Sequence, residues 1–147
     1  MSAMATSFAS GFRRIISAWR FPMWPQKVEL IDQVMYDFPE LVLVMRHGAE
    51  PWVDLAVKLM LKWPNLYYST SAFAPRYYPR EIIEYANTRG ASRVMYGGYY
   101  PMGLSLERIM AELDDVPFHD DVFPAFLRDN ARRVLGLDGP TDQQEEQ

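Results

Sequence analysis

The chain has 147 residues, of which 49% are hydrophobic and 23% charged, and its mean hydropathy is −0.21, all typical of one globular domain. Its net charge of −4 argues against general nucleic-acid binding, and no apolar run reaches the length of a membrane span. The absence of cysteine excludes disulfides, thiolate nucleophiles and cysteine-ligated zinc within this chain, and it fits a cytoplasmic protein.

Two terminal segments are expected to lie outside the folded domain. Residues 1–24 are predicted to form an N-terminal arm that includes a short amphipathic helix at 7–20. Pro22 and Pro25 follow that helix, and a helix does not continue through two such closely spaced prolines. The polar and acidic residues 139–147 are predicted to form a disordered tail, so the expected domain spans residues 25–138.

Three apolar runs are predicted to be strands of a parallel sheet, at about 41–47, 66–72 and 93–98. The first begins with five consecutive apolar residues, from Leu41 to Met45, which is the pattern of a strand buried on both faces. Apolar residues at helical spacing predict helices that alternate with these strands. The predicted helices span residues 27–38, 51–63, 79–88 and 104–113, and residues 121–137 are predicted to form one or two closing helices.

The predicted strands start 25 and 27 residues apart, which is the spacing of βα units joined by right-handed crossovers. The predicted fold class is therefore α/β. Two architectures fit three such units: a small open sheet, or part of a (β/α)8 barrel, because a complete barrel takes roughly 250 residues. Three strands of a barrel leave two unpaired edges, so we expect a homo-oligomer or a complex with another chain.

The first strand ends in Arg46 and His47, at the end of a parallel strand where α/β folds place their chemistry. His47 is therefore the candidate catalytic residue, since an imidazole suits acid–base chemistry near neutral pH. The alternative is a strand-end histidine that only hydrogen-bonds to backbone. Arg46 is a candidate anion anchor for a substrate, although alternation along a strand puts it opposite His47 and favours an ion pair with an acid.

Hydroxyl groups follow the second and third strands. Ser69 and Tyr99 are candidates to line a substrate pocket, together with Tyr68 and Ser71. The alternative for the tyrosines of this region is a role in the core or in an interface.

Two further motifs are interpreted as structural. His119 precedes Asp120 and Asp121, a combination that occurs in metal sites, but an aspartate that caps the next helix is the simpler account. The Gly97-Gly98 turn lacks the spacing and the lysine of a phosphate-binding loop.

Four segments of the chain resemble the C-terminal portion of the amidohydrolase-related family of metal-dependent (β/α)8 barrels. The branch they are most similar to includes aminocarboxymuconate-semialdehyde decarboxylase and the resorcylate-type decarboxylases. The segments are a Phe-Pro strand that ends in His-Gly, a Pro-Asn strand that ends in Ser, a strand that ends in Gly-Gly-Tyr-Tyr-Pro, and a closing Asn-Ala-Arg helix. They span residues 38–49, 63–71, 93–101 and 130–137.

The resemblance implies that the three strands are the sixth to eighth of a barrel and that His47 matches the sixth-strand histidine, which moves protons or polarises the substrate or water. It also implies a divalent metal such as zinc as the cofactor. Tyr99, however, stands where the family has a metal-binding aspartate, and the family's other histidine ligands have no counterpart here. No metal ligand is therefore assigned to this chain.

These observations lead to two expected functions. The first is an amidohydrolase-like hydrolase or non-oxidative decarboxylase of a small organic acid, completed by a partner chain or by self-association. The alternative is a degenerate, non-catalytic family member that acts as a binding or structural subunit.

Overall fold

The computed structural model describes residues 24–98, 100–101 and 103–137. Its sheet contains three parallel strands in the order β1 (Leu43–Met45), β2 (Leu66–Ser69) and β3 (Val94–Met95). In the register, Met45 pairs with Tyr68, and Tyr68 pairs in turn with Val94. The predicted α/β fold with parallel strands is confirmed.

The paired strands are shorter than the predicted ranges. After Met45 the chain turns into the 3-10 helix η2 (His47–Ala49), so pairing stops before the predicted end at residue 47. Only two residues of β3 pair with β2, and β2 accordingly ends at Ser69 rather than at residue 72. A ladder of hydrogen bonds extends only where a neighbouring strand runs alongside.

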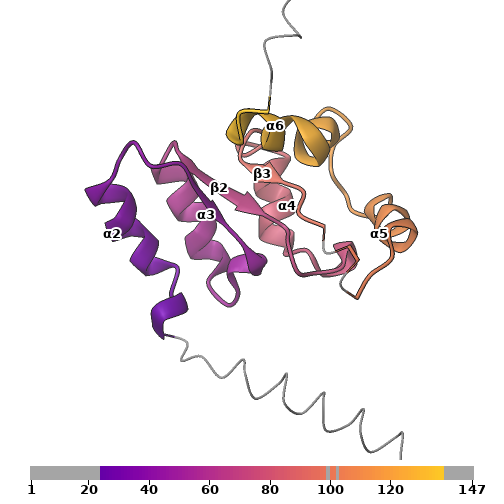
Figure 1. Ribbon diagram of the computed structural model, residues 1–147, viewed down its shortest axis with the longest axis horizontal. Helices are drawn as coiled ribbons and strands as arrows, with labels where there is room; N and C mark the ends of the chain where they lie inside the picture. Colours follow the sequence, from indigo (N-terminus) through magenta and orange to yellow (C-terminus); the bar gives the residue numbers. More distant parts are fainter. Residues whose placement is uncertain (1–23, 99, 102, 138–147) are drawn as a thin grey trace, which may run out of the picture.

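Helices separate and follow the strands along the chain (Figure 1). The α-helices are α2 (Glu29–Asp37), α3 (Val53–Lys62), α4 (Arg80–Ala86), α5 (Leu106–Leu113) and α6 (Asn130–Val134). The short helical turns are η1 (Trp24–Gln26), η3 (Pro75–Tyr77) and the π-helical segment η4 (Ala125–Asp129), which runs directly into α6. The arm predicted for residues 1–24 lies outside the described residues except for Trp24, and so does the tail predicted for residues 139–147.

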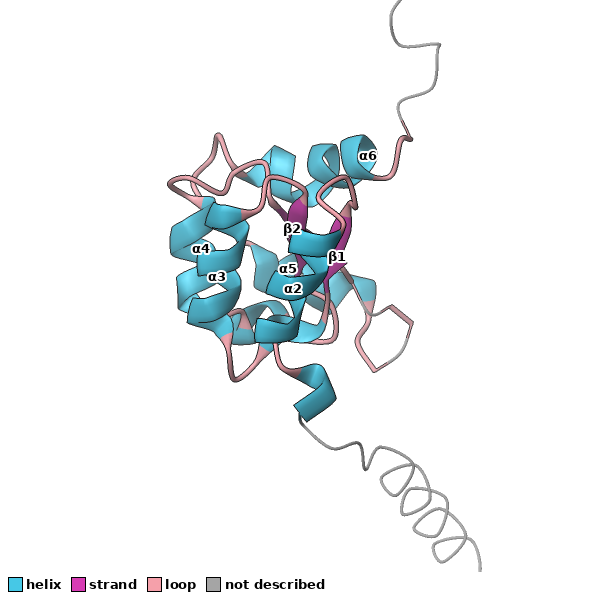
Figure 2. Cartoon of the chain, turned by 90° about the vertical axis from the view of Figure 1, so that its left-hand side faces the viewer, coloured by secondary structure: helices cyan, strands magenta, loops and turns pink. Residues whose placement is uncertain are grey.

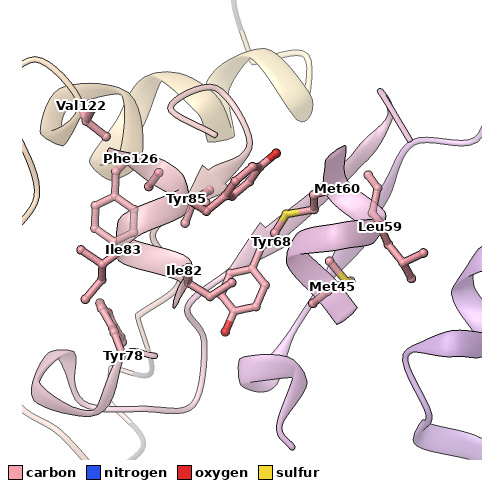
Figure 3. Close-up of a cluster of buried hydrophobic side chains, with 14 of the residues drawn as sticks. Met45, Leu59, Met60, Tyr68, Tyr78, Ile82, Ile83, Tyr85, Val122 and Phe126 are labelled. Carbon is pink, nitrogen blue, oxygen red and sulfur yellow. The ribbon is translucent and has the colours of Figure 1, made fainter. Parts of the chain in front are cut away.

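The core lies between the sheet and the helices α3 and α4, which stand together on one side of it (Figure 2). Tyr68 is fully buried there, with Met60 of α3 and Ile82 of α4 nearby (Figure 3). Because side chains alternate along a strand, Tyr67 and Ser69 point to the opposite face of β2. Among the described residues, no helix is long and apolar enough to cross a membrane.

The two edges of the sheet differ. Along β3, the Tyr96 N–H donates to the Phe126 carbonyl at 2.8 Å, and the Asn130 side-chain amide donates to the Val94 carbonyl at 2.8 Å. The Arg133 guanidinium donates to the Ser92 carbonyl at 2.6 Å. The segment η4–α6 therefore seals this edge, and α6 lies beside β3 in Figure 1. Among the described residues no strand pairs with the opposite edge, which is formed by β1, and we call it the open edge.

Candidate active site

The carboxyl ends of the strands bring His47 and Ser71 together. The His47 backbone N–H donates to the Ser71 Oγ at 3.1 Å, and the His47 Nδ1 lies 3.5 Å from the same oxygen. Ser71 follows β2, is buried, and is 24 positions away in sequence, so the parallel pairing of β1 with β2 creates this contact. The imidazole itself belongs to an exposed residue and is accessible to a small molecule.

His47 has an uncommon backbone conformation. Its φ is +61°, in the left-handed region that side chains other than glycine rarely adopt, and Ala49 and Ala72 share this feature with φ of +55° and +77°. All three residues lie in the turns that follow β1 and β2. Such conformations cost of order 1–3 kcal/mol each and cluster at functional sites, where the surrounding structure holds them in place.

Gly97 joins the third strand to this group. Its N–H donates to the Thr70 Oγ1 at 3.4 Å. A Cβ at Gly97 would lie 2.2 Å from the Ser69 Oγ and 3.1 Å from the Ser71 Cβ, so only glycine fits here without displacing β2. Ser69, a predicted substrate contact, is therefore covered by Gly97 and is only 8% exposed.

The other predicted site residues are less closely grouped. Arg46 is exposed, and among the described residues it has neither a hydrogen bond nor an ion pair, so the expected partner acid is absent there. Tyr99 lies outside the described residues. Thr70 was not singled out from the sequence, although the run Ser69-Thr70-Ser71 at a strand end is a visible signal for a cluster of hydroxyls.

Two buried phenols lie beneath the strand ends. Burial raises the pKa of the Tyr68 hydroxyl far above its usual value, and the negative charge of Glu50 adds to this effect. Burial also raises the pKa of Tyr78 to about 12, against the opposing effect of its hydrogen bond with Thr70. Both phenols are therefore neutral at physiological pH. The Tyr68 hydroxyl is buried without a hydrogen-bond partner among the described residues.

A pocket of about 360 Å³ adjoins the end of β2. Its lining is largely apolar, with one guanidinium, and consists of Ala72, Phe73, Ala74, Tyr77, Gly103, Leu104 and Arg108. Ala72 directly follows Ser71, which places one wall of the pocket next to the residue that holds His47. Arg108 donates from its Nε to Glu112 at 2.8 Å. The sequence does not indicate this pocket, because its walls come from two segments that are distant in the chain, residues 72–77 and 103–108.

A family model described as Amidohydrolase matches residues 17–137. The chain belongs to the amidohydrolase family. Among solved structures, it is similar to an uncharacterised TIM-barrel protein from Bordetella bronchiseptica, with 32% sequence identity and a TM-score of 0.68. No curated protein matches.

That alignment covers 78% of this amidohydrolase-family chain and 41% of the Bordetella chain, so the chain spans less than half the length of this neighbour. Its three parallel strands with alternating helices are consistent with part of a TIM barrel. The resemblance to amidohydrolases is thereby confirmed at the level of the family. The branch that includes aminocarboxymuconate-semialdehyde decarboxylase remains a prediction.

The metal that the amidohydrolase family implies does not fit the donors described here. Within residues 24–98, 100–101 and 103–137, no group of three His, Cys, Asp or Glu side chains gathers at one point. The strand ends offer the His47 imidazole and the hydroxyls of Ser69, Thr70 and Ser71, whereas zinc sites use at least three nitrogen, sulfur or carboxylate ligands. These donors do not by themselves make such a centre.

Proposed function

We propose that this amidohydrolase-family chain carries the proton-transfer part of a hydrolytic site for a small organic acid, with His47 as the general acid and base. The observation that carries the proposal is the contact between His47 and Ser71. It fixes an exposed imidazole in a left-handed turn at the carboxyl end of a parallel strand. Non-oxidative decarboxylation by the same residue is the alternative reaction.

In this proposal the neutral His47 imidazole takes a proton from water while the water oxygen bonds to the electrophilic carbon of the substrate. The bond from that carbon to nitrogen or oxygen then breaks, and the imidazolium returns the proton to the leaving atom. The substrate's apolar part fits the pocket beside Ala72, and its carboxylate fits Arg108 or the exposed Arg46. Ser71 acts as a positioning residue by holding His47.

A second candidate function is a non-catalytic binding or structural subunit. The observation that favours it is the donor set that the described residues offer at the strand ends, which provides one imidazole and hydroxyls but no carboxylate cluster. In this case the left-handed turn at His47 has only a structural role.

A comparison of two histidine variants separates these candidates. The full chain is assayed for hydrolysis of chromogenic esters, amides and lactones that carry a carboxylate, with and without added Zn²⁺ or Mn²⁺. We expect His47→Gln to reduce turnover by about 10²–10⁴-fold, the usual contribution of a general acid–base residue. His119→Gln, at the only other histidine and also exposed, is the matched control and retains the activity.

Absence of turnover by the unmodified chain under all these conditions, or equal turnover of His47→Gln and the control, excludes His47 catalysis. The non-catalytic candidate then stands.

A further inference from the structure

One flank of α5 faces the pocket beside Ala72. Arg108 and Glu112 are four residues apart on this helix, so their side chains lie on the same side of it. Arg108 lines the pocket together with Tyr77 of η3. Glu112 forms an ion pair with Arg76, also of η3, at 3.4 Å. The flank of α5 that carries Arg108 and Glu112 therefore faces η3 and the pocket.

The helix that carries these side chains is fixed in place. Ile109 and Leu113 of α5 are buried in the core, and α5 packs against η3. At the start of the helix, the Ser105 hydroxyl accepts a hydrogen bond from the Arg108 backbone N–H at 3.2 Å and caps the first turn. A binding group on an anchored helix is placed more precisely than one on a loop.

Glu112 holds the guanidinium of Arg108. The Arg108 Nε donates to the Glu112 Oε1 at 2.8 Å. The second carboxylate oxygen, Oε2, is buried without a hydrogen-bond partner among the described residues, so protein encloses the carboxylate on that side. The bond from Arg108 also lowers the pKa of Glu112. The bond uses only the Nε–H, and within the described residues no hydrogen bond engages the two Nη atoms of Arg108.

The charges beside the pocket favour an anion. Arg76 and Arg108 both pair with the Oε1 of Glu112, so two guanidiniums share one carboxylate and one positive charge is left over. Arg76 also lies over the ring of Tyr77, 4.9 Å from its centroid, and so brings its charge close to a wall of the pocket. An acid in the pocket is therefore attracted by both cations.

We propose that Arg108 anchors the carboxylate of the substrate acid and that Glu112 is the positioning residue that holds Arg108 for this purpose. This proposal rests on the proposed function, in which the anchor is Arg108 or Arg46, and it assigns the role to Arg108. The two Nη atoms bind the two carboxylate oxygens side by side. The apolar part of the acid lies against Phe73 and Leu104.

Arg46 lacks both features that qualify Arg108. It is not among the residues that line this pocket. It also has no ion pair among the described residues that would fix its guanidinium. A guanidinium that is already held loses less conformational freedom when it binds a carboxylate. The ligand class is thus a carboxylic acid with an apolar body, and a neutral amide of the same shape lacks both the charge and the second acceptor oxygen.

A binding measurement on the full chain tests the assignment. Phenylacetate and its neutral analogue phenylacetamide are titrated into the isotopically labelled protein, and their Kd values are obtained by NMR. Neither compound is an ester or lactone substrate, and the titration reports binding alone. We expect phenylacetate to bind about tenfold more tightly than phenylacetamide, and Arg108→Gln to remove this preference.

Arg80→Gln is the matched control. Arg80 forms the same pair with a glutamate four residues later, Glu84, at 2.6 Å, but it lies on α4 and does not line the pocket. This variant is expected to retain the preference for phenylacetate. The assignment is overturned if the unmodified chain shows no preference, or if Arg46→Gln removes the preference and Arg108→Gln does not.

A second pair of variants tests the role of Glu112. Glu112→Gln and Glu112→Met remove the same charge and have similar size, but only glutamine keeps an oxygen that accepts the Arg108 Nε–H. We expect Glu112→Met to bind phenylacetate about fivefold more weakly than Glu112→Gln, with both variants folded by circular dichroism. Equal Kd values for the two variants would show that Glu112 does not position Arg108.

Turnover distinguishes failure of the Arg108 anchor from failure of the proposed function. If phenylacetate binds through Arg108 but the chain turns over none of the chromogenic substrates, catalysis by His47 is excluded and the anchor stands. If turnover depends on His47 but Arg108→Gln changes neither the Kd of phenylacetate nor the KM of carboxylate-bearing substrates, the anchor is excluded and the proposed function stands.

Discussion

The Asn130 Nδ2 lies 2.8 Å from the carbonyl oxygen of Val94, so a helix side chain occupies the position that a neighbouring strand would take along β3. The same amide donates to the Ala91 carbonyl at 2.7 Å. In a closed barrel every strand has a strand on each side, whereas here the last strand is bounded by the chain's own closing helix. Within the described residues, this contact explains why the sheet has one edge without a partner and not two.

Loss of the Asn130 amide is expected to destabilise the domain. Asn130 is 2% exposed, and Asn130→Leu leaves the Ala91 and Val94 carbonyls unpaired in the interior. Unpaired buried groups cost about 1–3 kcal/mol each, so for these two carbonyls we expect the free energy of unfolding in urea to fall by about 2–6 kcal/mol. Asp129→Ala, one position earlier and exposed, is the control and should change it by less than about 0.5 kcal/mol. Equal effects of the two substitutions would contradict this account of the sealed edge.

A methyl group at Gly97 is expected to conflict with β2. The new Cβ of Gly97→Ala would lie 2.2 Å from the Ser69 Oγ, and such overpacking typically costs about 1–3 kcal/mol. Ser69→Ala removes that oxygen, so the double variant Gly97→Ala/Ser69→Ala should recover part of the lost stability. Thermal unfolding of the unmodified chain, the two single variants and the double variant measures this coupling. Strictly additive changes in stability would show that Gly97 and Ser69 are not in contact.

Removal of the Ser71 hydroxyl is expected to release the His47 turn. Ser71→Ala removes the Oγ that accepts the hydrogen bond of the His47 N–H. Such a hydrogen bond stabilises the turn by about 1 kcal/mol, so its loss is expected to make amide hydrogen exchange at His47 about fivefold faster. Ser92→Ala, at an exposed serine before β3, provides the control. An unchanged exchange rate at His47 in Ser71→Ala would mean that the turn is held by other groups.

Stability is expected to decline in alkaline solution. Burial raises the pKa of Tyr78 to about 12 and raises that of Tyr68 as well, whereas an unfolded tyrosine titrates near 10. Above pH 10 the unfolded chain therefore loses protons that the folded chain retains, and unfolding becomes more favourable as pH rises. Each phenol should lower the free energy of unfolding by about 1.4 kcal/mol per pH unit between pH 10 and 12. Urea titrations with Tyr68→Phe/Tyr78→Phe should show a flatter decline, and an equal slope would refute the assignment.

Local sequence patterns were sufficient to predict the parallel α/β fold. The apolar run Leu41–Met45 and the regular spacing of three strand starts predicted βα units, and the structure has them in sequential order. The strand end also pointed to His47, because the first polar residues after a buried strand lie at the carboxyl edge of the sheet. The fold prediction succeeded because it depends on residues close in the chain, whereas the catalytic role of His47 stays a prediction.

The contacts that define the site and the edges could not be predicted in this way. The bond between His47 and Ser71 depends on the register of β1 against β2, and the seal on β3 depends on Asn130 reaching back 36 positions to Val94. Both join residues whose types are common and whose sequence neighbours give no sign of the pairing. The sequence by itself thus determined the class of fold and one candidate residue. Only the tertiary structure decided which strand edge stays open, because that depends on which distant polar groups satisfy each backbone donor and acceptor.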